Sequence, residues 1–303
     1  MKASFFRRFG GPEVLEYGDL PDPAPGPGEV LVDIHAASVN AADWKMRRGD
    51  YGPKVDFPHV MGRDFSGVVV RSAGDFKPGD EVYAVTEVPR EGAYAEKIAI
   101  REPIVALKPK GLSHVQTAAI ALAGLTAVVS VEETLKLQRG ETILIQGGAG
   151  GVAGFAIALA KHLGARVITT ASASNHDYVR KLGADQVIDY RSQDFRKVVK
   201  NVDAVFDTVG GEVTMPSFEV IRSGGRLAFI AGFAAPQSPR ADVASLRPKV
   251  DRSRARLDRV TELVSKGAVP IPEIVEYPLA KAADAHRVSE ARHLRGKLVL
   301  RVR

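Results

Sequence analysis

The segment from Gly147 to Ala153 carries the spacing that points most directly to chemistry. It reads GGAGGVA, between the apolar runs TILIQ and GFAIALA. Glycine lets a backbone approach a ligand closely because it has no Cβ. A predicted strand runs into this turn and a predicted helix follows it, so free N–H groups and the positive end of the helix dipole meet there. We therefore predict a pyrophosphate site formed by Gly150, Gly151 and Val152.

The end of the following predicted strand indicates which nucleotide would bind. An NAD site usually places an acidic side chain there, on the ribose 2′-hydroxyl. Between Thr142 and His176 the chain has no Asp or Glu. Ser172 can donate a hydrogen bond and His176 can carry positive charge, so both would accept a 2′-phosphate. The sequence predicts NADP(H) as the cofactor; the alternative is that these two residues only form a turn.

Composition excludes several other kinds of site. The 303 residues include no cysteine and seven scattered histidines without ligand spacing, so we expect no metal site, no disulfide and no thiol nucleophile. A net charge of +6 can attract nucleic acid or a phosphorylated ligand. The basic run at 247–259 is interrupted by acids and contains no aromatic residue, so we expect no specific nucleic-acid partner.

Two further sequence features bear on location. No apolar run of eighteen residues is present, and the first residues, MKASFFRRFGG, lack the apolar segment of a secretory signal. We expect no membrane span and a cytoplasmic protein.

The elements that would position these residues fall into two patterns. Before Gly111, alternating apolar residues in EVLVDI and Pro- and Gly-rich turns at 21–28 and 76–82 predict a small β-barrel. After it, Ser113 and Gln116 form a capping-box pattern that opens a helix. Strands predicted at 142–146, 165–170, 185–189, 203–207 and 226–232 then alternate with helices, which indicates a doubly wound parallel sheet. Two amphipathic helices and a strand at 297–302 follow.

Several longer segments, read together, resemble a known family. They include PGPGEVLVDIHAASVNAADWK, PHVMGRDFSGVVV, AGLTA, QGGAGGVAG, VDAVFDTVGGE and HLRGKLVL. The chain resembles the medium-chain dehydrogenase/reductases, in the zinc-independent quinone oxidoreductase (zeta-crystallin-like) and enone reductase branch. The resemblance implies an α/β protein with a GroES-like β-barrel catalytic domain at 1–112 and 251–303. A Rossmann-type domain at 113–250 would hold the doubly wound parallel sheet, and the active site would lie in the cleft between the two.

The resemblance also bears on the reaction. Zinc-dependent relatives have Cys where this chain has Asn40 and His where it has Arg63, so no catalytic zinc is implied. The implied substrate is a small quinone, or an enone or alkenal whose C=C is activated by conjugation. NADPH would supply the hydride, and the protein would position the reactants and stabilise the enolate oxygen. The alternative is a non-catalytic NADPH-binding protein with a regulatory or structural role.

The resemblance implies roles for individual residues. Lys45 stands where quinone-type relatives often have Tyr, and it can donate a hydrogen bond or proton to the enolate; the alternative is a surface lysine. Asn40 would bond near the nicotinamide ribose or the substrate, and Tyr51 is a second candidate donor. Further cofactor contacts would come from Thr126, Tyr190, Phe229, Gly232, Phe233, Gly296 and Lys297. A strand near 241–246 would pair across a homodimer.

Overall fold

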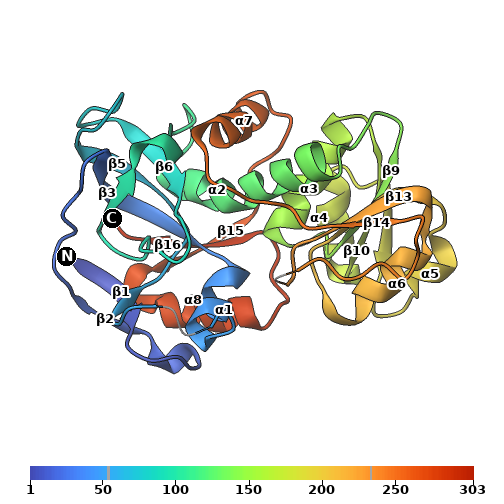
Figure 1. The fold of residues 1–303 in the computed structure, drawn as a ribbon, viewed down its shortest axis with the longest axis horizontal. Coiled ribbons are helices and arrows are strands. Elements are labelled where there is room, and N and C mark those ends of the chain that lie inside the picture. Colours follow the sequence, from blue (N-terminus) through green and yellow to red (C-terminus); the bar gives the residue numbers. More distant parts are fainter. Residues whose placement is uncertain (53–54, 233) are drawn as a thin grey trace. The chain divides into compact units, whose positions relative to one another are not determined.

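A computed structural model describes residues 1–52, 55–232 and 234–303 (Figure 1). The chain packs into two compact units, and each unit is built from separate segments. Unit 1 comprises Met1–Leu122, Arg252–Thr261 and Glu273–Arg303, and unit 2 comprises Ala123–Asp251 and Glu262–Pro272.

A mixed sheet forms the centre of unit 1. Its strands lie in the order β15 (Ile274–Pro278), β16 (Lys297–Arg301), β3 (Glu29–Val39), β5 (Asp64–Arg71), β6 (Glu81–Val85) and β8 (Val105–Leu107), and β7 (Lys97–Arg101) also pairs with β3. Val30, Val32 and Ile34 on β3 are fully buried, as their alternation with polar residues predicts. The strand β3 therefore contributes to the core of unit 1, and helix α1 (Ala41–Arg48) begins shortly after its last residue.

Smaller elements complete unit 1. A second sheet has the order β2 (Glu16–Asp19), β1 (Lys2–Phe6) and β4 (His59–Val60). Helix α8 (Ala282–Glu290) contacts α1, and β16 follows α8 to pair in parallel with β15 and antiparallel with β3. The last strand of the chain thus lies inside the sheet, beside the strand that leads into α1.

Unit 2 holds a six-stranded sheet in which every pair is parallel. Its order is β11 (Gln186–Asp189), β10 (Arg166–Ala171), β9 (Thr142–Gln146), β12 (Val202–Asp207), β13 (Ile221–Phe229) and β14 (Ala244–Leu246). The direction of strand addition reverses between β9 and β12. Ligands in such sheets bind outside the carboxyl ends of the strands at this reversal.

The helices of unit 2 confirm the predicted alternation. They are α3 (Gly151–His162), α4 (His176–Lys181), α5 (Phe195–Val198) and α6 (Thr214–Glu219). Two further helices have residues in both units: α2 (His114–Val128), which continues into a π-helical segment at Val129–Thr134, and α7 (Arg254–Ser265). The capping box that opens α2 is present, because Ser113 N bonds Gln116 Oε1 at 2.9 Å and Gln116 N bonds Ser113 Oγ at 3.1 Å.

One helical stretch among the described residues, His114–Thr134, is long and apolar enough to cross a membrane. Its most apolar window is 78% buried within the structure. Such burial is typical of a core helix, whose apolar faces are covered by protein on most sides.

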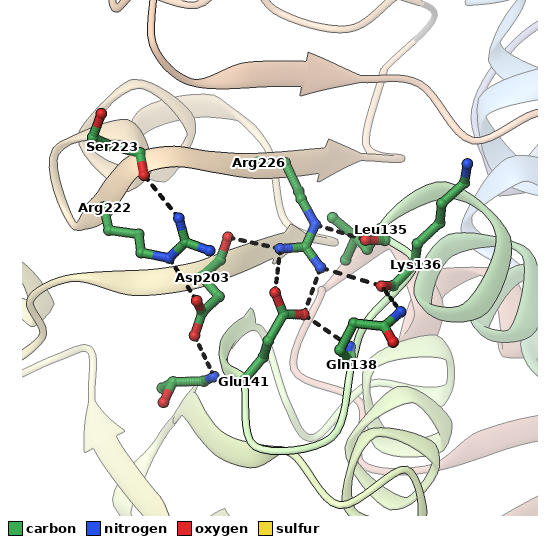
Figure 2. A network of polar contacts seen from close by, with 9 residues as sticks. Leu135, Lys136, Gln138, Glu141, Asp203, Arg222, Ser223 and Arg226 are labelled. Atoms are coloured by element: carbon green, nitrogen blue, oxygen red, sulfur yellow. Dashed lines mark hydrogen bonds and ion pairs between the residues drawn. The ribbon is translucent and has the colours of Figure 1, made fainter.

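An ion network ties together the amino ends of the central strands of unit 2 (Figure 2). Arg226 on β13 donates to both carboxylate oxygens of Glu141, at 2.8 and 2.6 Å, and to the Leu135 carbonyl at 2.6 Å. Asp203 on β12 accepts from the Thr142 backbone at 2.7 Å and from Arg222 at 2.6 Å. Because ligands bind at the opposite, carboxyl ends of such strands, we assign this network to the stability of unit 2.

Candidate functional site

The turn after β9 contains glycines at positions where a residue with a side chain would not fit. Gly147 has φ +77°, a conformation that L side chains rarely adopt. A Cβ on Gly148 would lie 2.3 Å from Thr169 Oγ1. The turn is fixed to β10 because Gly147 N bonds Thr170 Oγ1 at 3.0 Å and Gly148 N bonds the Thr170 carbonyl at 2.9 Å.

The helix that follows begins without a capping side chain. Gly150 is the N-cap of α3, no side chain caps the helix, and its first turn contains no acid. The N–H groups of Gly151 and Val152, in that first turn, therefore have no partner within the helix and remain available to an anion. This cradle fits the pyrophosphate of a dinucleotide, as the sequence predicts.

The predicted 2′-phosphate contacts come from neighbouring strand ends. Ala171 at the end of β10 is paired with Asp189 at the end of β11, so the residues that follow them, Ser172 and Tyr190, leave the sheet side by side. Ser172 is 8% exposed and Tyr190 is 49% exposed. His176 begins α4, and its Nε2 is buried without a hydrogen-bond partner among the described residues. Because this atom is covered by protein, a 2′-phosphate could reach it only if the side chains around it moved. Contact of His176 with the cofactor stays a prediction.

The turn interpretation of Ser172 also has support. Its Oγ accepts a hydrogen bond from Asn175 Nδ2 at 3.1 Å and lies 3.2 Å from Ser174 Oγ. The hydroxyl thus has local partners, and a ligand would join or replace them.

Sequence reasoning missed Arg191, although it directly follows the predicted Tyr190. Its guanidinium lies 5.8 Å from the centre of the Tyr190 ring. In NADP-binding proteins an arginine close to the ribose commonly binds the 2′-phosphate. The nearby acid, Asp189, is engaged by its own turn: hydrogen bonds from Arg191 N and Ser192 Oγ lower its pKa, and His176 contributes a weaker effect in the same direction.

The other predicted contacts of unit 2 lie in helix α2, in strand β13 and in the loop after β13. Thr126 lies in α2, is 8% exposed, and its carbonyl accepts from Ser130 Oγ at 2.7 Å. Phe229 ends β13 and packs against the core of unit 2. A Cβ on Gly232 would lie 3.0 Å from the Phe229 ring, a tight contact that the ring would have to relieve by a small shift. Phe233 lies outside the described residues.

In unit 1 the candidate residue Asn40 is held between a buried acid and a buried amine. Its Nδ2 donates to Asp64 Oδ1 at 2.8 Å, and its Oδ1 accepts from Lys297 Nζ at 2.7 Å. The same amine donates to the Val39 carbonyl at 3.0 Å. The structure thus brings two predicted site residues, Asn40 and Lys297, into direct contact at the start of α1.

The acid of this group is fully buried and well bonded. Asp64 accepts from Ser38 Oγ at 2.8 Å and from Leu122 N at 2.9 Å. Burial raises the pKa of Asp64, while the charge of Lys297 opposes that rise. Burial likewise lowers the pKa of Lys297, and Asp64 opposes this. Each group therefore offsets part of the cost of burying the other.

Gly296 has a packing role in the structure. It adopts φ +73°, and a Cβ there would lie 2.0 Å from the Glu273 carbonyl oxygen. Only glycine fits, and this close approach sets the start of β16 and hence the position of Lys297. Contact of Gly296 or Lys297 with the cofactor stays a prediction.

The two candidate proton donors lie against other side chains of unit 1. Lys45 is half-buried, and its Nζ lies 5.6 Å from the centre of the Trp44 ring, which Arg48 and Arg292 also approach, at 5.2 and 5.6 Å. Tyr51 follows α1, and its ring centre is 5.1 Å from the guanidinium carbon of Arg63.

A buried chain of hydrogen bonds that the sequence did not reveal ends at Asp43. Arg47 can only donate, so His286 Nδ1, 2.9 Å away, must accept, and the proton of the neutral ring resides on Nε2. That nitrogen lies 3.3 Å from the Tyr94 hydroxyl, which donates to Asp43 Oδ2 at 2.8 Å. Asp43 Oδ2 also accepts from Asn40 N at 2.8 Å. Burial raises the pKa of Asp43 to about 7.

Comparison with known proteins identifies the family. Residues 26–110 match the alcohol dehydrogenase GroES-like domain, and residues 182–300 match a family described as zinc-binding dehydrogenase. The chain is 33% identical to the chloroplastic NADPH-dependent alkenal/one oxidoreductase of Arabidopsis thaliana, over 99% of this chain and 79% of that protein. The chain belongs to the medium-chain dehydrogenase/reductase superfamily.

Solved structures place it within the quinone oxidoreductase and enone reductase branch. The quinone oxidoreductase of Coxiella burnetii is 34% identical, with a TM-score of 0.91 over 100% of this chain and 99% of that one. The Escherichia coli quinone oxidoreductase complexed with NADPH is 27% identical, with a TM-score of 0.92 over 100% of both chains. The family resemblance and the α/β fold with GroES-like and Rossmann-type parts are thus confirmed for this medium-chain dehydrogenase/reductase.

Proposed function

We propose that this protein is an NADPH-dependent oxidoreductase that transfers hydride to a quinone or to the activated C=C of an enone or alkenal. The observation that carries the proposal is the cradle of unit 2, where Gly147, Gly148 and Gly150 shape an anion site beside a strand end without an acid. Likeness over the whole chain to an alkenal/one oxidoreductase and to quinone oxidoreductases supports the substrate class.

The dinucleotide, when bound, supplies the hydride. The protein's part begins with binding: Gly151 and Val152 offer N–H groups to the pyrophosphate. Ser172, His176, Tyr190 and Arg191 are the candidates to contact the 2′-phosphate, because Ser172 and Tyr190 follow neighbouring strand ends and Arg191 lies against the Tyr190 ring. In unit 1, Asn40 is held by Asp64 and Lys297 and so presents one fixed orientation. Lys45 or Tyr51 gives a hydrogen bond or a proton to the enolate, and a hydrogen bond to its oxygen lowers the energy of the charge that develops there.

We propose that the reaction needs no zinc. Asn40 and Arg63 occupy the positions at which zinc-dependent relatives carry ligands, and the chain has no cysteine. Both residues also have partners of their own, since Asn40 bonds Asp64 and Lys297 and Arg63 contacts Glu91. A conjugated acceptor does not require a metal, because its own carbonyl withdraws electrons from the β-carbon.

We also propose a homodimer and a cytoplasmic location. The strand β14 lies at the end of the sheet order of unit 2, and such an edge can pair with the same strand of a second copy. Absence of cysteine suits a reducing compartment. The domain limits 1–112 with 251–303 and 113–250 remain our proposal for the two family domains.

The proposed activity can be tested by incubating the protein with NADPH and a panel of quinones, enones and alkenals. We expect loss of nicotinamide absorbance with at least one acceptor and formation of the reduced product. Tight NADPH binding without turnover of any acceptor would instead support a non-catalytic binding protein.

A further inference from the structure

A buried arginine lies beneath one of the two candidate proton donors. The guanidinium carbon of Arg63 is 5.1 Å from the centre of the Tyr51 ring, and Arg63 is only 8% exposed. At this distance a cation is attracted to the face of an aromatic ring, more strongly when little water intervenes. The position of the Tyr51 ring is therefore coupled to that of the Arg63 side chain.

Arg63 is fixed at both of its ends. Its carbonyl accepts from Thr86 N at 2.7 Å and from Thr86 Oγ1 at 3.2 Å. Its Nη2 lies 3.1 Å from Glu91 Oε1, and Glu91 Oε2 in turn lies 3.2 Å from His59 Nε2. The side chains of this Arg63–Glu91–His59 cluster are at most 10% exposed. An arginine held in this way can hold a neighbouring ring.

The charge of Arg63 is only partly used within the cluster. Among the described residues, its Nε and Nη2 are buried without a hydrogen-bond partner, and neither carboxylate oxygen of Glu91 has one. The contact with Glu91 is thus an ion pair without the directed hydrogen bonds of a typical Arg–carboxylate fork. The field of the guanidinium also reaches Asp43, where it opposes the rise in pKa that burial causes. Positive charge is therefore available to other groups nearby.

We propose that Arg63 is a positioning residue for Tyr51: its guanidinium holds the ring and stabilises the tyrosinate left when Tyr51 gives up its proton. The proposal rests on the proposed function. In this step the O–H bond of Tyr51 breaks and its proton bonds the α-carbon of the enolate. The phenolate then takes a proton from water, so Tyr51 is restored for the next turnover.

A double-mutant cycle tests the coupling. We expect Arg63→Met to lower kcat for an enone about ten- to a hundredfold, as part of the effect of a general acid, while KM for NADPH changes less than about twofold. In a Tyr51→Phe background the same substitution should lower kcat less than about twofold, because its target is gone. Arg63→Lys keeps the charge without the planar guanidinium and should recover part of the loss.

A matched control lies elsewhere in unit 1. Arg254 also stacks on a ring, that of Phe76 at 4.8 Å, and is paired with Asp75 at 3.1 Å and with Glu102. Arg254→Met removes a comparable cation–π contact and ion pair. It should lower thermal stability yet change kcat less than about twofold.

Fluorine NMR supplies a readout that does not depend on turnover. In protein labelled with 3-fluorotyrosine, the resonance lost in Tyr51→Phe identifies Tyr51. It should shift in Arg63→Met and stay in place in Arg254→Met.

Three results would contradict the inference in different ways. An unchanged Tyr51 resonance in Arg63→Met would show that the two side chains are not in contact in solution. Equal losses of kcat from Arg63→Met in the two backgrounds would show that Arg63 does not act through Tyr51. A wild-type protein that reduces no acceptor would contradict the proposed function itself, and the catalytic role of Arg63 with it.

Discussion

The amine of Lys297 lies 2.7 Å from the side-chain oxygen of Asn40, 257 positions earlier in the chain. Asn40 is the N-cap of α1 and Lys297 is the first residue of β16. The carboxamide also donates to the buried Asp64. The last strand of the sheet thus fixes the orientation of a candidate site residue, and the buried charge that does so must be balanced.

Replacing Lys297 should therefore destabilise the protein. In Lys297→Met the buried carboxylate of Asp64 loses its charged neighbour, and we expect the free energy of unfolding in urea to fall by about 3–5 kcal/mol. In a protein that already carries Asp64→Asn, Lys297→Met should lower the free energy of unfolding much less, because no buried carboxylate is left without its charged neighbour. Equal costs in the two backgrounds would show that Lys297 and Asp64 do not compensate each other.

Cofactor preference should follow from the strand ends of unit 2. We expect kcat/KM to favour NADPH over NADH by about ten- to a thousandfold, because one to three charge-assisted contacts to the 2′-phosphate supply that range. Arg191→Ala should weaken binding of 2′-phosphorylated nucleotides in a calorimetric titration and leave NADH binding nearly unchanged.

The control for this variant is Arg196→Ala. Arg196 is a nearby arginine already engaged by Asp194 at 2.8 Å. Equal use of both cofactors by the wild type would show that the 2′-phosphate is not recognised here.

Lys45→Ala separates the two candidate proton donors. If Lys45 stabilises the enolate as an oxyanion-hole group does, kcat for an enone should fall by a factor equivalent to about 3–4 kcal/mol. NADPH affinity should hardly change, and a quinone should be affected less because its reduced oxygen is a weaker base.

Arg48→Ala is the matched control, because Arg48 lies against the same Trp44 ring. Intact enone turnover in Lys45→Ala would make Lys45 a residue that only covers Trp44, and Tyr51 the donor to test next.

Chelation tests the proposed independence from zinc. Because Asn40 and Arg63 stand at the positions of the relatives' ligands, activity should survive exhaustive treatment with a strong chelator. Elemental analysis of the untreated protein should find no stoichiometric zinc. One zinc bound per chain, with loss of activity on its removal, would refute the proposal.

Stability should depend on pH through His286. Burial, and then the charge of Arg47, lowers the pKa of His286 from 6.5 to about 3. Between these values the unfolded chain binds a proton that the folded chain does not, so the stabilisation present above pH 6.5 is lost as pH falls toward 3. The stability advantage of wild type over His286→Gln should shrink across this window, by at most about 1.4 kcal/mol per pH unit.

Asp43, at the other end of the same series of buried hydrogen bonds, affects stability with the opposite dependence on pH. Burial raises the pKa of Asp43 from 3.8 to about 7, so its contribution to stability falls as pH rises between these values. Wild type and His286→Gln both carry Asp43, so its effect cancels when the free energies of unfolding of the two proteins are subtracted. Parallel stability curves for the two proteins would show that His286 does not titrate as the structure indicates.

Local sequence patterns predicted most of the fold. The strands of unit 2, the capping box at Ser113 and the glycine-rich turn each depend on residues close together in sequence, and all are present. Arg191 also had a local signal, because it follows a predicted site residue at the end of a strand.

Long-range packing limited the prediction of the site in unit 1. His286 bonds Arg47 across 239 positions, and nothing in their own sequence neighbourhoods indicates that both are buried. At Arg63 the sequence showed only that a zinc ligand of the relatives is absent. Its contact with the Tyr51 ring forms only when the start of β5 and the segment after α1 come together in the fold. Partners of this kind are specified by the three-dimensional arrangement of the whole unit.

The place of β16 in the sheet has a consequence for synthesis in the cell. The last four residues of β3, from Ala36 to Val39, pair with residues 298–301. The ribosome adds residues 298–301 after every residue of unit 2. Until then the nascent chain has an unpaired strand edge at Ala36–Val39, and Asn40 lacks its hydrogen bond from Lys297. All of unit 2 is thus synthesised while this edge is still unpaired. A premature stop codon before residue 298 would therefore damage the part of the protein that was made first.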